Sequence, residues 1–374
     1  MKKKLSFLLL FVSCFAIAQQ EKPAKAHTFD VNYMYGVIIN HNPNILHLIT
    51  GHPEGVLFSW NRKTFGKKEW EARFNYPDIG VSLSYHDLKN KNLGDTYSLY
   101  THYNFYFFKK RNLMLRTGIG VSYATNSYNH ETNNRNVAFG STLLNSTYLL
   151  LNYKKERLFK TPFGLQAGLG IAHYSNGNYK SPNTSVNVVS ANVGVTYNLN
   201  YEKEYTYVHH ELDKKTFRAP FAYNIAFSSG VNQGDVIGIE QFPFYVVAAY
   251  ADKRIGRFSG FQLGAEVFWS KFLKEEINYN SVAYPGRNID PNTDYKRVGI
   301  FVGHELWVNK MTFITQVGYY AYYPYEFEDR IYGRLGFKRY FGKRYFGMIN
   351  LKVHGAAAEA IEFGVGIRLQ NKNK

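Results

Sequence analysis

Apolar and polar residues alternate one by one along several stretches of this chain. Between residues 163 and 172, phenylalanine, leucine, alanine and isoleucine hold the odd positions, while glycine, glutamine and alanine hold the even ones. Successive side chains of a strand point to opposite faces, so a period of two predicts strands with one apolar face. The same alternation recurs at 113–123, 221–228, 261–270 and 361–370, where the second face mixes polar residues with glycine. An apolar outer wall around such an interior is typical of a transmembrane β-barrel.

The connections between these stretches also alternate, in length. Short turns are expected near 109–111, 254–256, 309–310 and 342–343, and longer polar loops near 87–95, 125–137, 176–184, 272–294 and 326–330. Short periplasmic turns and long external loops are the outer-membrane pattern, and an even strand number is expected. We therefore predict an all-β fold, a transmembrane antiparallel outer-membrane β-barrel of roughly 14 strands, with 12 to 16 compatible. A soluble β-sandwich also alternates, but it should not place tyrosine and phenylalanine so consistently on both sides of the turns.

The N-terminus has the pattern of a secretory signal peptide. Three lysines at 2–4 precede a short apolar core at 5–17, and small residues favour cleavage before Gln19. Cys14 is the only cysteine, so the mature chain excludes disulfides, cysteine nucleophiles and thiolate metal sites. We expect residues 1–18 to be removed and 19–374 to form a single barrel domain in the bacterial outer membrane.

The composition is basic and aromatic. The formal net charge is +17, of which the signal lysines contribute three, and aromatic residues make up 17% of the chain. A basic balance indicates nucleic acid or an anionic membrane, and export makes nucleic acid an unlikely partner. Lipid headgroups or lipid A phosphates are the expected partners. The candidate contacts are lysines of the predicted external loops, although loop solubility explains them equally well: Lys89, Lys91, Lys180 and Lys274.

The strongest chemical signal lies at the end of the 163–175 stretch. His173 and Ser175 are two residues apart on the apolar, outward face, where a base and a hydroxyl can form a nucleophile–base pair. A hairpin centred on Lys180 would set Asn187 of the next strand opposite His173, with Cβ atoms about 5 Å apart. The Asn187 amide could then accept one imidazole proton and leave the other nitrogen free, as in a catalytic triad. Chance, or a position at the headgroup boundary, is the alternative explanation.

These residues carry a family resemblance. The run His173-Tyr174-Ser175-Asn176, followed by Pro182-Asn183, resembles the signature of the PagL-type lipid A 3-O-deacylases, specifically over 161–199. The resemblance implies an outer-membrane serine esterase that removes an ester-linked acyl chain from the lipid A of lipopolysaccharide. Ser175 would be the nucleophile and His173 the base.

The resemblance also implies the remaining site residues. Asn187 stands where that family has a glutamate, and it would orient the base. The amide of Asn176 and the backbone N–H of Gly177 are the candidate oxyanion-hole donors. Pro182 and Asn183 support the motif without a separate role.

Two other functions remain open. The spacing of His173, Ser175, Gly177 and Asn187 is also similar to outer-membrane phospholipase A, whose third member is Asn and for which calcium would be the cofactor. A non-catalytic barrel, serving as a pore or structural protein with a vestigial motif, is the alternative from another class. The length of the chain resembles the long acyloxyacyl hydrolases rather than a minimal eight-strand deacylase. The sequence indicates no particular oligomeric state.

The remaining polar clusters are weaker signals. His209, His210, Glu211 and Asp213 lie close together but lack the spacing of a metal motif, so a solvated loop is the better interpretation. We therefore predict no metal and no cofactor for the deacylase.

Overall fold

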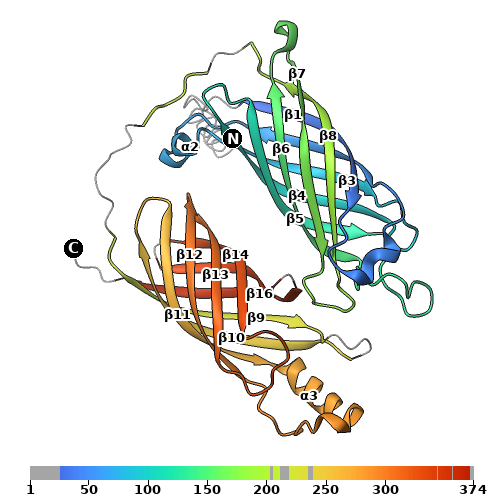
Figure 1. The fold of residues 1–374 in the computed structure, drawn as a ribbon. Coiled ribbons are helices and arrows are strands. Elements are labelled where there is room, and N and C mark those ends of the chain that lie inside the picture. The colour runs from blue at the N-terminus through green and yellow to red at the C-terminus, as the bar shows by residue number, and fades with distance from the viewer. Residues whose placement is uncertain are drawn as a thin grey trace, which may run out of the picture.

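The chain forms two closed antiparallel barrels of eight strands each (Figure 1). The computed structural model describes residues 26–202, 205–210, 219–234, 239–342, 344–355 and 357–370. The predicted all-β class is confirmed, and the expectation of a single barrel with roughly 14 strands is wrong. Every strand of either architecture has one outer and one inner face, so the alternation alone cannot tell one large barrel from two small ones. The predicted signal peptide lies outside the described residues.

The first barrel contains the strands that carry the His-Ser motif. It closes because β1 pairs with both β2 and β8. Its elements are β1 (His27–Ile38), η1 (Pro43–Leu48), β2 (Glu54–Arg62), α2 (Glu69–Arg73), β3 (Asp78–Asp87), β4 (Asp95–Phe107), β5 (Leu113–Ala124), β6 (Leu143–Lys155), η2 (Leu158–Lys160), β7 (Phe163–Ser175) and β8 (Val186–Asn198).

The second barrel closes in the same way, because β9 pairs with both β10 and β16. Its elements are β9 (Ala222–Asn232), β10 (Phe242–Arg254), β11 (Ser259–Ser270), α3 (Lys271–Ala283), η3 (Pro285–Arg287), β12 (Arg297–Val308), β13 (Met311–Tyr322), β14 (Ile331–Phe341), β15 (Tyr345–His354) and β16 (Ala357–Gln370). Within the described part of the chain, no helix is long and apolar enough to cross a membrane.

The walls of both barrels follow the predicted alternation. Outward residues are large, apolar and exposed, as at Leu169 and Leu263, which are 63% and 64% exposed. Inward neighbours such as Gln166 and Gln262 are buried. A band of apolar side chains on the outside is what a lipid environment stabilises.

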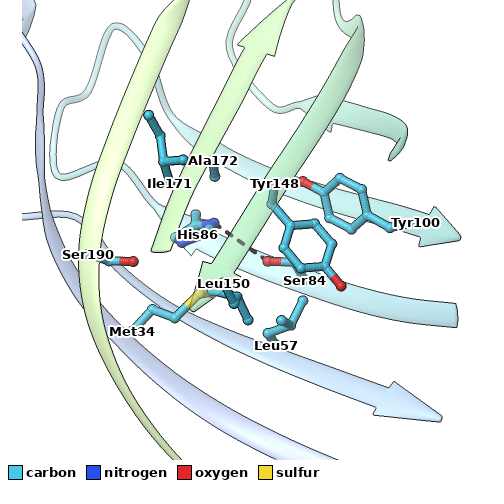
Figure 2. A pocket seen from close by; sticks show the side chains of 10 residues that line it. All are labelled: Met34, Leu57, Ser84, His86, Tyr100, Tyr148, Leu150, Ile171, Ala172 and Ser190. Carbon is cyan, nitrogen blue, oxygen red and sulfur yellow. Dashed lines mark hydrogen bonds between the residues drawn. The ribbon is translucent and has the colours of Figure 1, made fainter. Parts of the chain in front are cut away.

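The interior of the first barrel is filled by side chains. Arg116 forms a buried ion pair with Asp30 at 2.7 Å and donates to Asn104 at 2.7 Å. Nearer the other end, a void of about 10 Å³ remains among Tyr100, Tyr148 and their neighbours (Figure 2). That volume is at the lower limit for one water molecule, so this part of the interior is a packed core.

Buried ion pairs occupy the interior of the second barrel. Arg334 lies between Glu266 and Glu362, at 3.0 and 2.8 Å, and all three side chains are buried. Lys352 pairs with Glu359 at 2.8 Å. Charges in a low-dielectric interior are tolerated when each is paired in this way.

The segment 199–221 links the two barrels. It contains the stretch 200–219, which is long and charged for an inner turn of a single barrel. Eight strands return the chain to the end where it started, so both barrels begin and end on the same side. At this end Glu69 pairs with Arg257 at 2.6 Å, and the Phe74 and Phe258 rings lie 4.9 Å apart. The barrels also meet at the opposite end, beside the His-Ser motif.

Candidate active site

The hairpin of β7 and β8 has the predicted register. His173 is paired with Asn187, and the His173 Nδ1 atom lies 2.7 Å from Asn187 Oδ1. Between His173 and Ser175, Tyr174 points into the barrel, where its hydroxyl bonds His86 Nδ1 at 2.6 Å. Because Tyr174 is anchored inward, His173 is held on the outer wall.

Ser175 is the last residue of β7 and is only 6% exposed. Its Oγ accepts hydrogen bonds from the Gly177 backbone N–H at 3.0 Å and from Asn183 Nδ2 at 3.1 Å. Gly177 has a φ of +66°, a conformation that favours glycine. No hydrogen bond joins Ser175 to His173 in the described part of the chain. Two N–H donors therefore converge on the candidate nucleophile, while the candidate base is hydrogen-bonded to Asn187.

Asn183 has a structural role that the sequence did not reveal. Its Oδ1 accepts from the Asn176 backbone N–H at 3.0 Å and lies 3.2 Å from Ser175 Oγ. The preceding Ser181–Pro182 peptide bond is cis. Asn183 thus ties the end of β7 to the far side of its own loop.

The Asn176 side chain supports the loop rather than facing the site. Its Nδ2 donates to the Lys180 carbonyl at 2.6 Å and lies 3.3 Å from Ser141 Oγ. Of the two predicted oxyanion-hole donors, the Gly177 N–H is directed at Ser175, and the second donor there is Asn183.

His41, in the loop after β1, is a site residue that sequence reasoning missed. Its Nδ1 lies 3.3 Å from Asn187 Nδ2, and its Nε2 lies 2.9 Å from the Thr184 carbonyl. Both His41 nitrogens face a carbonyl, because Nδ1 also lies 3.1 Å from the Ile39 oxygen. An amide nitrogen only donates, so the Asn187 bond requires the tautomer with the proton on Nε2, which the shorter contact to Thr184 favours. In that tautomer the bond directs Asn187 Oδ1 at His173. The signal was weak, because His41 is 146 residues from Asn187 and only closure of the barrel brings β1 beside β8.

The weaker polar cluster does not form a metal site in the described part of the chain. His209 Nδ1 bonds the Tyr76 hydroxyl at 3.0 Å, and His210 Nε2 bonds the Gly66 carbonyl at 2.6 Å. Glu211 and Asp213 lie outside the described residues. No group of three or more potential metal ligands occurs among the residues that are described.

The predicted loop lysines differ in their surroundings. Lys89 pairs with Asp87 at 2.8 Å and Glu54 at 3.6 Å, and the hydrogen bond to Asp87 raises the pKa of Lys89. Lys91, Lys180 and Lys274 are exposed and form no ion pair within the described segments. The charge of Lys89 is therefore already compensated by the protein, unlike that of the other three.

Two family models match the chain, one for each barrel. A model described as lipid A 3-O-deacylase (PagL) matches residues 54–196, and one described as acyloxyacyl hydrolase, C-terminal domain, matches residues 221–372. The residues outside both matches are 1–53, which include β1, then 197–220 and the last two. The chain belongs to the PagL-type family, and the outer membrane is its location. No curated protein matches the chain.

The solved structures that resemble the chain are only distantly similar to it. The outer membrane protein Omp33 of Acinetobacter baumannii is 7% identical, with 92% of this chain and 99% of that chain covered, at a TM-score of 0.18. A porin mutant of Rh. blastica is 8% identical, with coverages of 92% and 100% and a TM-score of 0.19. The transport unit of the Escherichia coli autotransporter AIDA-I is 6% identical, with coverages of 95% and 92% and a TM-score of 0.19. TM-scores this low show no shared overall fold. The two-barrel architecture is assigned from the strand pairing.

Proposed function

We propose that this protein is an outer-membrane serine esterase that removes an ester-linked acyl chain from lipid A. The observation that carries the proposal is the 2.7 Å contact between His173 and Asn187 on the outer wall of the first barrel, two residues before Ser175. Ser175 is the last residue of β7. In the topology predicted from loop lengths the following loop is external, which would put Ser175 near the outer-leaflet headgroups. Ester bonds of lipid A lie close to its sugar headgroup, so this height suits the substrate.

In the proposed reaction, Ser175 Oγ attacks the ester carbonyl and His173 Nε2 takes its proton. The sugar oxygen then leaves with the proton held by His173, and the acyl group stays on Ser175. Water, activated by the same imidazole, releases the fatty acid and restores the serine. The Ser175 hydroxyl must first turn from Asn183 towards His173, a movement that substrate binding has to drive.

The surrounding amides suit the steps of this reaction. Asn187 Oδ1 accepts the proton of His173 Nδ1, which leaves the lone pair of Nε2 available as the base. The Gly177 N–H and Asn183 Nδ2, which now contact Ser175 Oγ, would lie within reach of the oxyanion on the attacked carbon.

One observation favours outer-membrane phospholipase A activity as a second candidate. The third member of the constellation is an amide, Asn187, where the deacylase pattern has a carboxylate. In that case the substrate would be a phospholipid, and calcium would be the cofactor.

The test is mass spectrometry of lipid A and phospholipids after expression in a host that lacks both activities. Lipid A that has lost one acyl chain supports the deacylase, and lysophospholipid supports the second candidate. Ser175→Ala and His173→Ala should each reduce ester release at least a thousandfold, because residues that act as a unit fail together. Full activity in either variant would refute the assignment.

A further inference from the structure

The loop between β7 and β8 is held from outside its own barrel. In the segment that follows β9 of the second barrel, Gln233 Oε1 accepts from the Ser181 backbone N–H at 3.0 Å. The Gly234 carbonyl accepts from Ser181 Oγ at 2.8 Å, and Asn178 Nδ2 donates to the Gln233 carbonyl at 3.2 Å. Ser181 and Gln233 are both only 6% exposed. These polar bonds are therefore sheltered from water, which makes their loss costly.

Further contacts continue along the same loop. Gln241 Nε2 donates to the Tyr179 carbonyl at 2.5 Å. The space beside Gly177 is occupied by Ile361 of β16, since a Cβ built on Gly177 would lie 2.4 Å from the Ile361 side chain. Further along β16, Phe363 and Val365 are 61% and 63% exposed, whereas Ile361 is half-buried. The wall of the second barrel is thus covered where it meets this loop.

The opposite side of the loop holds Ser175. Asn183 bonds the Ser175 hydroxyl, and the Lys180 carbonyl accepts from Asn176, the residue after Ser175. The bonds to Gln233 and Gly234 are made by Asn178 and Ser181, which lie between Asn176 and Asn183 in the sequence. These bonds between the β7–β8 loop and the second barrel lie where the ends of β7 and β9 approach each other in Figure 1.

We propose that the second barrel positions the catalytic loop of the first, and that Gln233 is the positioning residue at the centre of this contact. The inference rests on the proposed function, because it assigns a role around the same nucleophile. Gln233 touches no reacting atom. It fixes residues 178 and 181, so that Gly177 and Asn183 keep their donors on Ser175. The second barrel is on this account a support for catalysis in the first, with no catalytic site of its own required.

Simple packing of two barrels is the competing explanation. It predicts that apolar contact along the walls matters and that no single polar atom does. The present contact is instead concentrated on the five residues that follow Asn176, and its central bond depends on one acceptor, Gln233 Oε1.

The test compares Gln233→Met with Gln233→Glu in the full-length protein. Methionine keeps the length of the side chain but removes the acceptor, whereas glutamate keeps an acceptor for the Ser181 N–H. We expect Gln233→Met to lower kcat about tenfold with little change in KM, and Gln233→Glu to stay within about threefold of the wild type. Asn292→Ala, at an exposed external position of the same barrel, is the matched control and should leave both constants unchanged.

Hydrogen exchange of residues 176–184 provides a readout that needs no activity. The loop should lose protection in Gln233→Met and keep it in Gln233→Glu. If the wild type releases no acyl chain, the proposed function fails, while exchange still tests whether Gln233 holds the loop. Wild-type kcat in Gln233→Met, unchanged loop exchange in that variant, or an equal loss in both variants would overturn the inference. Each variant must first show the gel shift on boiling that marks a folded barrel.

Discussion

The amide of Asn187 has two different ends, and only one of them can orient His173. A carboxylate in this position would present an acceptor in either orientation, whereas an amide turned over would present a donor and favour the wrong tautomer. Asn187 also lacks the charge that would stabilise the imidazolium formed during catalysis. The site therefore depends on whatever fixes the orientation of this one side chain.

Removal of the Asn187 amide should slow turnover strongly. We expect Asn187→Ala to lower kcat by a factor of about 10² to 10⁴, with KM much less affected, because the base loses its orientation and tautomer. Asn187→Glu should preserve or raise kcat, since a carboxylate also stabilises the imidazolium. Steady-state kinetics on a purified lipid substrate measures both. An Asn187→Ala variant with unchanged kcat would mean that a His-Ser dyad suffices.

His41 should matter only while residue 187 is an amide. His41→Ala removes the acceptor for Asn187 Nδ2, so the amide can turn over, and kcat should fall about tenfold, the equivalent of one hydrogen bond. In an Asn187→Glu background the same change should have almost no effect, because both carboxylate oxygens accept. Equal losses in the two backgrounds would show that His41 acts in some other way.

At the scale of the element, the β7–β8 hairpin joins a regular ladder to an irregular loop. Asn183 is the link, because one amide group serves both Ser175 and the backbone of Asn176. An aspartate would keep the acceptor for Asn176 but lose the donor to Ser175.

Asn183→Asp should therefore separate folding from catalysis. We expect the variant to insert and shift on gels normally, while kcat falls about a hundredfold, because a negative charge replaces an oxyanion donor. Asn183→Ala should lose activity and also loosen the loop, as measured by hydrogen exchange. Wild-type turnover in Asn183→Asp would remove Asn183 from the proposed oxyanion site.

The hairpin shows where sequence reasoning succeeds. The period of two assigned the faces of β7 and β8, and the loop length set the register that pairs His173 with Asn187. The contacts of Asn183 and His41 could not be obtained this way. The first depends on backbone turns within a loop, and the second on which strands meet when the barrel closes.

At the scale of the whole molecule, the alternation of apolar and polar residues could not predict the number of barrels. Sixteen alternating strands fit one wide barrel or two narrow ones, and the difference lies in whether β8 pairs with β1 or with β9. Residues 200–219 are long and charged for an inner turn, but the prediction of a single barrel did not treat them as a break between domains. In a narrow barrel the inward side chains must fill the interior, and here inward charges such as Lys338 and Arg334 are almost completely buried.

The protein should therefore not conduct ions. In planar lipid bilayers we expect no stepwise conductance at concentrations where a general porin, used as the control, gives clear steps. Inward charges are buried and paired in the first barrel, as at Arg116 and Asp30, and in the second, as at Arg334 and Lys352. We therefore expect no continuous water path through either barrel. Reproducible conductance steps from the folded protein would support the pore alternative.

The even strand number of each barrel has a consequence for how such units can be combined in one chain. A closed unit whose two ends lie on one side can be joined in tandem to another such unit through a simple tether, and both copies keep the same orientation across the bilayer. A unit with an odd number of strands would end on the opposite side of the membrane. The following unit would then be inverted, with its long loops on the periplasmic side. Joining two such units end to end is thus topologically simple, because no strand has to be gained, lost or re-paired.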